Sequence, residues 1–269
     1  MREERSLDRL EATRRSVLAV AQVVRALESL SRAQRASVEE AAGDASRYLD
    51  WIDELVGQLA GPPESAAGAD PLSIVMGPER GFCGPLAHRI AEQIPSQGAL
   101  GIVGTRLAEV LDETPAVSAR TRFRLPGAAA VEELPRGARE LAARILEEHP
   151  IGSVWLFHPR DSGSELHAVE LLSGPRRLAP RLAFETWSPP ERVLELAVST
   201  SVAGRLAVGL AEVLRSEVLA RLLATGAARQ ACEQQLEDLR RSILNVSQEQ
   251  TTRELLEVVT SHLTGVAST

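Results

Sequence analysis

The chain has 269 residues and a formal net charge of −7, and it is 44% hydrophobic and 25% charged. This is the composition of a globular protein, and the acidic balance argues against broad nucleic-acid binding. The N-terminus is charged from Arg2 onwards and lacks the apolar core of a signal peptide, and no apolar run approaches the ~20 residues that span a bilayer. Neither the two cysteines, Cys83 and Cys232, nor the five histidines show metal-ligand spacing. We therefore expect a cytosolic chain with no metal, no cofactor, no nucleic-acid partner and no direct membrane insertion.

Proline divides the sequence into three parts. All fifteen prolines lie between Pro62 and Pro190. Because proline costs about 3 kcal/mol inside a helix, the two proline-free ends are expected to be helical and the middle to differ. The prediction is an N-terminal coiled-coil helix over 1–61, an α/β domain over 71–188 and a C-terminal coiled-coil helix over 189–269.

The N-terminal part is predicted to be one amphipathic helix from about Ser6 to Leu59. Apolar residues recur at helical spacing along one face, namely Leu7, Leu10, Val17, Val20, Val24, Leu27 and Leu30. A helix with so narrow an apolar stripe needs a partner to be stable. A helical bundle broken at Gly43 and Gly57 is the alternative.

The middle part alternates short apolar runs with helical patterns. Strands are expected at Leu72–Met76, Leu100–Val103, Arg120–Leu125, Ser153–His158 and Leu166–Leu172, and helices at Gly84–Ile94, Thr105–Leu111 and Glu132–Glu148. The order βαβαβαββ predicts a small α/β domain with a mostly parallel sheet, covered by helices on both faces. Arg120–Leu125 is expected at an edge of the sheet.

The segment Gly81-Phe82-Cys83-Gly84 follows the first predicted strand, where doubly wound folds place their ligand loops. It fails as a phosphate cradle because GxGxxG and GKS/GKT patterns are absent and Glu79 adds negative charge. Gly81, Cys83 and Gly84 are therefore expected to form a structural turn. The alternative is a nucleophilic Cys83 whose pKa is lowered at a helix N-terminus.

The C-terminal part is predicted to be a helix from Glu191 to Leu263 that starts in Ser188-Pro189-Pro190-Glu191. Leu236, Leu239, Ile243 and Val246 step by three, four and three residues, the seam spacing of a coiled coil. Gly204, Gly209 and Gly226 are tolerable if they let two backbones approach closely. The predicted fold class is thus α/β plus a long antiparallel α-helical coiled coil formed by the N- and C-terminal helices.

Several motifs together resemble the gamma subunit of F-type ATP synthases. Ser216-Glu217…Arg221…Ala224 is similar to the family's SEHxxRMxAM block, and Gln248…Thr252 to Val259 is similar to RQxxITxELxEIVxGA. Pro78 to Gly84 resembles SDRGLCG, and Ala26-Leu27-Glu28 stands where the family has AM-x-MV. Ser247 replaces the arginine of the family's RQ pair, and a divergent branch such as the N-type ATPases would fit.

The resemblance implies a fold and a function. The fold is two terminal helices in an antiparallel coiled coil with a Rossmann-like domain between them. The function is that of the central-stalk rotor subunit, which couples ion flow through the membrane c-ring to conformational cycling of the catalytic beta subunits. Such a chain is not itself an enzyme and carries no cofactor. The implied partners are the alpha and beta subunits, the epsilon subunit and the c-ring, at the cytoplasmic face of the inner (plasma) membrane.

The resemblance also implies site residues. Gln248, Thr252 and Glu254 would contact a beta-subunit loop, and a bearing at the shaft tip would hold Leu255, Val258, Val259 and Leu263. Two other functions stay open at this point. One is a cysteine-dependent α/β enzyme that uses Cys83, and the other is a coiled-coil adaptor that has lost the rotor role.

Overall fold

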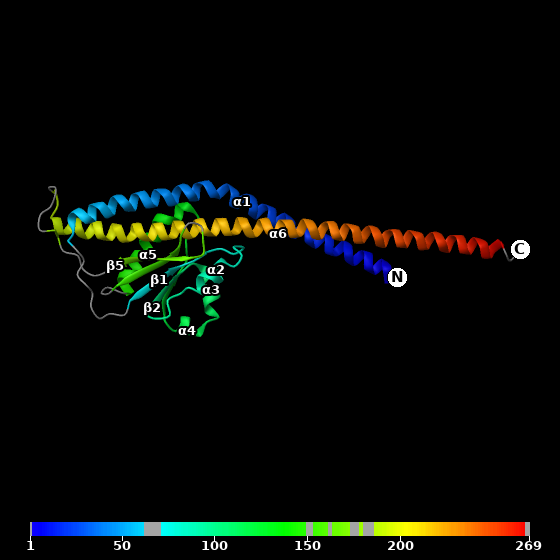
Figure 1. Ribbon diagram of the computed structural model, residues 1–269, viewed down its shortest axis with the longest axis horizontal. Helices are drawn as coiled ribbons and strands as arrows, with labels where there is room; N and C mark the ends of the chain where they lie inside the picture. The colour runs from blue at the N-terminus through cyan, green and yellow to red at the C-terminus, as the bar shows by residue number, and fades with distance from the viewer. Residues whose placement is uncertain are drawn as a thin grey trace. The chain divides into compact units, whose positions relative to one another are not determined.

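The computed structural model describes residues 2–61, 71–148, 153–160, 163–172, 178–179 and 186–266. The chain forms two compact units. We call Met1–Ser29 with Thr225–Thr269 the helical unit, and Leu30–Ala224 the sheet unit. Two helices, α1 (Arg2–Leu59) and α6 (Pro190–Val266), contribute residues to both units (Figure 1).

Both long helices are continuous in the structure. Gly43 and Gly57 lie inside α1, so the predicted alternative of a bundle broken at these glycines is wrong. The α6 helix begins at Pro190, with Glu191 in its first turn, as the sequence predicted. Proline fits the first position of a helix because its missing N–H would have no partner there.

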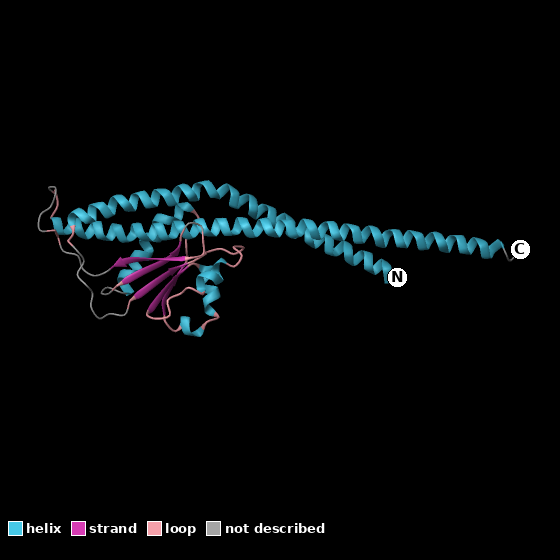
Figure 2. Ribbon diagram, in the orientation of Figure 1, coloured by secondary structure: helices cyan, strands magenta, loops and turns pink. Residues whose placement is uncertain are grey.

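The sheet unit contains a five-stranded sheet in the order β3-β2-β1-β4-β5 (Figure 2). The strands are β1 (Leu72–Met76), β2 (Ala99–Val103), β3 (Thr121–Leu125), β4 (Val154–Pro159) and β5 (Leu166–Leu172). The β1–β2, β1–β4 and β2–β3 pairs are parallel, whereas β4 and β5 are antiparallel. The mostly parallel sheet and the edge position of β3 are therefore confirmed.

The central strand shows why these residues form a buried parallel sheet. In β1, Ile74 lies opposite Gly101 of β2 on one side and Leu156 of β4 on the other. All five β1 residues are buried. A strand covered on both faces needs a near-continuous apolar run, which Leu72–Met76 supplies apart from Ser73.

Helices cover both faces of the sheet. Leu72, Ile74 and Met76 point into a core shared with α5 (Leu134–Glu148) and α6. Val75 points to the opposite face, where α2 (Leu86–Ala91) and α3 (Thr105–Asp112) pack. Two short helices, α4 (Pro115–Ser118) and η1 (Val131–Glu133), were not predicted.

The α2 helix is shorter than the predicted Gly84–Ile94. Gly84 has a φ angle of 55°, which is incompatible with a right-handed helix. Pro85 takes the N-cap position, so the helix starts at Leu86. The apolar periodicity was correctly identified, but the turn before the helix takes two of the predicted helical residues.

Within the sheet unit, α6 approaches its neighbours through glycines. A Cβ atom on Gly209 would lie 2.9 Å from Met76 Sδ and 3.0 Å from Leu156 Cδ2, so helix and sheet touch where this side chain is missing. A Cβ atom on Gly204 would lie 3.3 Å from Leu49 Cδ1 of α1. Close approach is thus found at both positions, although the nearest atoms are side-chain atoms, whereas a Cβ atom on Gly226 would meet nothing within 4 Å.

The two helices run antiparallel in each unit. In the helical unit, Arg229 Nε donates to Glu28 Oε2 at 3.1 Å, and Arg25 lies 3.7 Å from Glu233. Moving four residues forward on α6 from the first pair moves three residues back on α1, which is the register of an antiparallel pair. In the sheet unit, Asp53 of α1 accepts hydrogen bonds of 2.6 Å each from Ser201 and Arg205 of α6.

The apolar seam of the helical unit is narrow. The α6 side of the predicted seam, Leu236, Leu239, Ile243 and Val246, is half-buried. On α1, Ala21 and Val24 are buried, whereas Val20, predicted to lie on the buried stripe, is 53% exposed. Leu30, in the sheet unit, is exposed as well. The buried residues of α1 here are Ala21, Val24, Glu28 and Ser31, which step by three, four and three residues, so the buried stripe lies beside the predicted one.

One stretch within α6 corrects the expectation that no segment is apolar enough for a membrane. By length and composition alone, an 18-residue window inside Pro190–Thr260 has a mean hydropathy of 1.5, as membrane spans do. Buried residues of this helix, such as Leu206 and Leu210, belong to the core of the sheet unit. Of this window, 44% is buried, so packing accounts for part of its apolar character.

Candidate functional site

The loop between β1 and α2 lies at the carboxyl edge of the parallel sheet. We call residues 77–85 the β1 loop. Since β2 and β4 flank β1 on opposite sides, the loop marks the point where the strand order reverses. Open α/β sheets hold ligands in the crevice at such a switch point. The structure therefore places Gly81, Cys83 and Gly84 where a ligand loop is expected.

The β1 loop is held by a buried ion pair on α6. Glu217 Oε2 accepts the backbone N–H of Glu79 at 2.7 Å and that of Arg80 at 3.3 Å. Arg221, one turn further along α6, donates to the other carboxylate oxygen of Glu217 and to the carbonyl of Gly81. The Glu217 side chain is fully buried and that of Arg221 is 4% exposed. Burial raises the pKa of Glu217, an effect that Arg221 and the two backbone amides oppose.

A second carboxylate, that of Glu79, ties the β1 loop to its neighbours. Its Oε2 accepts the backbone N–H of Thr105 at 2.8 Å and that of Gly127 at 2.7 Å, and its Oε1 accepts the Thr105 hydroxyl at 2.7 Å. Glu79 therefore links the loop after β1 to the segments that follow β2 and β3, at the same edge of the sheet. In the sequence, the negative charge of Glu79 argued against a phosphate site. In the structure, this carboxylate accepts hydrogen bonds that hold these segments together.

Cys83 is a buried thiol in a tight turn. The turn contains Phe82, with a φ angle of 62°, and Gly84, with a φ angle of 55°. The Cys83 Sγ lies 3.3 Å from the carbonyl oxygens of both Arg80 and Gly81.

The expectation of a lowered pKa for Cys83 is wrong. Burial, and then the negative charge of Glu217, raise the pKa of Cys83 to about 12. The thiol also precedes α2 by three residues, so it does not lie in the first turn of that helix. A thiol that stays protonated at neutral pH is a poor nucleophile. The geometry therefore supports the structural turn and argues against cysteine catalysis.

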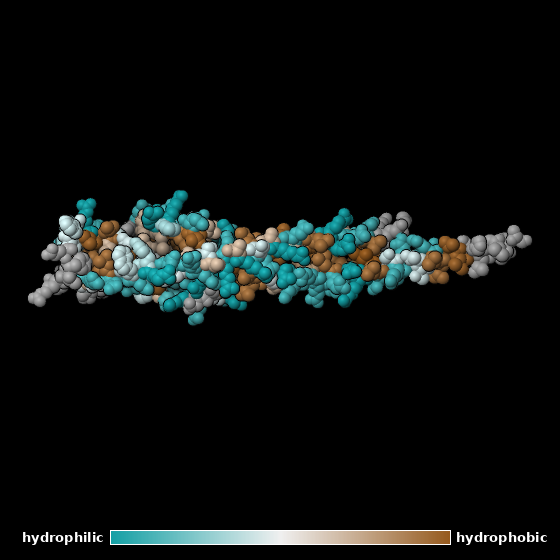
Figure 3. Space-filling model, turned by 90° about the horizontal axis from the view of Figure 1, so that it is seen from above, coloured by the Kyte–Doolittle hydropathy of each residue, from teal (hydrophilic) through white to brown (hydrophobic). Residues whose placement is uncertain are grey.

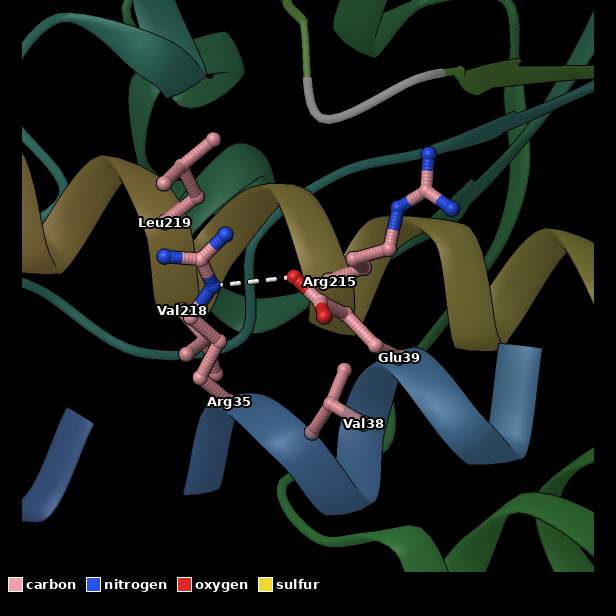
Figure 4. A pocket seen from close by; sticks show the side chains of 6 residues that line it. All are labelled: Arg35, Val38, Glu39, Arg215, Val218 and Leu219. Atoms are coloured by element: carbon pink, nitrogen blue, oxygen red, sulfur yellow. Dashed lines mark hydrogen bonds and ion pairs between the residues drawn. The ribbon is translucent and has the colours of Figure 1, made fainter. Parts of the chain in front are cut away.

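In the sheet unit, neither a metal cluster nor the hollow between α1 and α6 offers a site for a small ligand among the described residues. Among the described residues, no group of three His, Cys, Asp or Glu side chains could hold a metal ion. A hollow between α1 and α6 in the sheet unit measures about 40 Å³ (Figure 4). It is lined by Arg35, Val38 and Glu39 of α1 and by Arg215, Val218 and Leu219 of α6. This is far below the roughly 300–1,000 Å³ of ligand pockets.

Two of the three predicted partner-contact residues come together in the helical unit. Gln248 and Thr252 line one shallow groove with Asn245, Glu249, Arg253 and Leu256. The Thr252 hydroxyl donates to the backbone carbonyl of Gln248 at 2.8 Å. Glu254 is not part of this groove, and its carboxylate accepts a hydrogen bond from Gln250 at 3.1 Å instead.

The predicted shaft-tip residues are exposed where their side chains are described. Leu255 is 61% exposed, Val258 65% and Val259 54%. Figure 3 shows apolar surface in this part of α6, near its C-terminal end. The side chain of Leu263 lies outside the described part of the chain. Within the helical unit, α6 continues past the N-terminal end of α1, which explains this exposure (Figure 1).

Sequence reasoning missed the role of Glu217 and Arg221. Both residues belong to the segment that resembles the SEHxxRMxAM block of the gamma family, but the resemblance assigned no role to either of them. The available signal was an acid and a base four residues apart on a helical stretch, with the apolar run Val218-Leu219-Ala220 between them. Charged residues that interrupt an apolar stretch in this way are buried only when they are paired.

Residues 6–262 match the model of a protein family described as ATP synthase. The fold is similar to that of a chain in the mitochondrial ATP synthase of Euglena gracilis, in a structure of OSCP, F1 and the c-ring in rotational state 3. The two chains are 13% identical with a TM-score of 0.69, over 98% of this chain and 95% of that chain. A chain from the central stalk and c-ring of the Tetrahymena thermophila mitochondrial ATP synthase is also 13% identical. Its TM-score is 0.55, over 77% of this chain and 99% of that chain.

Among the curated proteins, no sequence matches this chain. The family match nevertheless spans almost its whole length, and it agrees with the helix pair and sheet described above. The chain therefore belongs to the gamma subunits of the ATP synthase family, the non-catalytic subunits of the central stalk.

Proposed function

We propose that the helical unit turns inside the ring of alternating alpha and beta subunits, while the sheet unit docks with the epsilon subunit on the membrane c-ring. The chain would act at the cytoplasmic face of the inner (plasma) membrane as a peripheral subunit. In this proposal residues 71–188 are the α/β domain, and 1–61 and 189–269 are the coiled-coil helices, whose ends from Met1 to about Val24 and from Arg240 to Thr269 lie inside the ring.

The exposed apolar stretch at the end of α6 carries this proposal. Four apolar side chains of this stretch are more than half exposed, namely Leu255, Leu256, Val258 and Val259. The part of α6 that lies in the sheet unit is instead packed against the sheet. Contiguous exposed apolar side chains mark interaction surfaces. An apolar sleeve without fixed ion pairs suits turning, so we assign Leu255, Val258, Val259 and Leu263 to the bearing.

The mechanism follows from the asymmetry of two unlike helices. A ring of three identical beta subunits meets different side chains of the helical unit at each position. Each beta subunit is then biased toward a different conformation, because a partner shifts an equilibrium by its difference in affinity for the two states. Rotation by one position exchanges these biases and so links ion flow to nucleotide affinity.

Gln248, Thr252 and Glu254 are our candidates for contacts with a beta-subunit loop. Gln248 and Thr252 are supported by their shared groove, which also contains three further polar or charged side chains. Hydrogen bonds are worth about 1 kcal/mol each, so the loss of two changes a state preference by roughly 30-fold.

The test uses the assembled complex with Gln248→Ala/Thr252→Ala in this chain. We expect both ATP hydrolysis and ATP-driven ion transport to change, and ion transport to fall more than hydrolysis, so that fewer ions move for each ATP consumed. The matched control is Gln235→Ala/Thr251→Ala, which removes the same side chains from α6 outside the groove. Equal behaviour of both double variants would remove Gln248 and Thr252 from the contact, and failure of this chain to assemble with alpha and beta subunits would contradict the rotor proposal itself.

A further inference from the structure

The two backbone N–H groups that Glu217 binds belong to consecutive residues, Glu79 and Arg80, and both point at the same carboxylate oxygen. Successive N–H groups that converge in this way form an anion-binding concavity. The concavity lies in the β1 loop, at the switch point of the sheet. In dinucleotide-binding folds this loop holds a phosphate group through its backbone N–H groups.

We infer that the β1 loop is an oxyanion site whose resident anion is the carboxylate of Glu217. The side chain takes the position and the hydrogen bonds that a phosphate or carboxylate ligand would take. It also explains how a loop without a GxGxxG pattern keeps the backbone arrangement of a ligand loop. This inference does not depend on the rotor function.

The side chains around the carboxylate form a built site. Arg221 supplies the cationic partner that an oxyanion needs, and its guanidinium also holds the Gly81 carbonyl at 3.3 Å. Glu217 and Arg221 are almost fully buried, so no solvent ion shares the position. Because both residues are one turn apart on α6, they form a single clamp from one helix face.

A covalently attached anion has a mechanical consequence. A diffusible ligand would leave α6 free to separate from the loop, whereas Glu217 joins the two directly. The loop is in turn joined through Glu79 to Thr105 and Gly127. The anion site therefore fastens the carboxyl edge of the sheet to the long helix.

The test is chemical rescue of the full-length Glu217→Ala variant. The truncation leaves two N–H groups and Arg221 around a vacated space of about the size of the lost carboxylate. We expect a lower melting temperature in sodium chloride. Sodium acetate at the same ionic strength should then raise it by about 3–6 °C at roughly ten times its dissociation constant, and the rise should continue with the logarithm of the acetate concentration. Inorganic phosphate is the second probe and reports whether the site also takes the larger oxyanion.

Three proteins serve as controls. The wild type has its anion in place. Glu217→Ala/Arg221→Met lacks the cationic partner. Asp53→Ala removes a carboxylate that also links α6 to another element through an arginine, but one that binds no backbone N–H in the described structure. In all three, acetate and chloride should give melting temperatures within about 1 °C of each other.

A position-specific readout accompanies the melting curves. Acetate binding should shift the amide proton resonances of Glu79 and Arg80 downfield in Glu217→Ala, toward their wild-type positions. If this variant does not fold in chloride, the yield of refolded protein in acetate and in chloride replaces the melting temperature. Rescue by acetate or by phosphate supports the inference. It is overturned if neither anion stabilises Glu217→Ala, or restores its folding, beyond the response of the three controls.

Discussion

The helices α1 and α6 contribute to both units, but α6 is much more buried in the sheet unit than in the helical unit. In the sheet unit, α6 is buried from Ser201 to Val218 apart from a few half-buried positions, since it contacts both the sheet and α1. In the helical unit the pair has a thin seam, and apolar side chains such as Leu244 and Leu255 are exposed. The difference teaches that the sheet unit has the larger buried core, whereas the helical unit leaves apolar side chains exposed, which is the surface that our proposal assigns to partners.

The largest expected effect is on the free energy of unfolding, and it compares two leucines of α6, one in each unit. Leu206 is fully buried in the sheet unit, and Leu244 is 50% exposed in the helical unit. Leu206→Ala should lower the free energy of unfolding by about 3–5 kcal/mol, because it removes buried methyl groups and leaves a cavity. Leu244→Ala should change it by less than about 1 kcal/mol. Urea unfolding of the isolated chain measures both, and similar losses would contradict the contrast between the units.

Two glycines of α6, one in each unit, sharpen the comparison, because replacing each by alanine should change the free energy of unfolding in opposite directions. Gly209→Ala places a methyl group 2.9 Å from Met76 Sδ and should destabilise the fold by about 1–3 kcal/mol despite the better helix propensity of alanine. Gly226→Ala has open space around it and should stabilise the helix by up to about 1 kcal/mol. Thermal unfolding would decide this, and a stabilising Gly209→Ala would show that α6 does not pack closely on the sheet.

A histidine should make the sheet unit sensitive to acid. Burial lowers the pKa of His158, and the nearby charges of His167 and Arg160 act in the same direction. A base with a lowered folded-state pKa stabilises the fold above its unfolded pKa of about 6.5, and this contribution is lost as the pH falls below that value. His158→Phe should therefore flatten the dependence of stability on pH below about 6.5. His88→Gln on α2, where the side chain is exposed, is the matched control.

The smallest expected effect at neutral pH concerns Cys83. Its pKa of about 12 means that folding keeps the thiol protonated, so stability is complete below pH ~8.5 and declines as the pH rises toward 12. In a Cys232→Ser background, iodoacetamide should label Cys83 at pH 8 at least about 100-fold more slowly in the folded chain than in urea. Fast labelling of the folded chain would restore the possibility of a reactive cysteine.

Much of the fold followed from local patterns. The absence of proline from both ends predicted two long helices, and the start of α6 at Pro190 was correct. The alternation of apolar runs predicted all five strands and their mostly parallel arrangement. Boundaries were less accurate where a turn intervened, as at Gly84, because a helical periodicity does not reveal that one residue adopts a positive φ angle.

The candidate site was only partly accessible from sequence. Gln248 and Thr252 share a groove because they are four residues apart on one helix, a relation that spacing already contains. The raised pKa of Cys83 could not be inferred from the sequence, because the charge of Glu217 comes from α6, which is remote in the sequence.

The sequence by itself determined which segments are helix and strand, and it carried the motifs of the gamma family. Those properties depend on neighbours within a few residues. Only the tertiary structure decided that Glu217 binds the backbone of Glu79, 138 residues away in the sequence. It also decided which faces of α6 are buried and which stay exposed. Such contacts depend on how whole elements pack, because a buried charge is stable only where distant backbone and side-chain groups meet it in the right geometry.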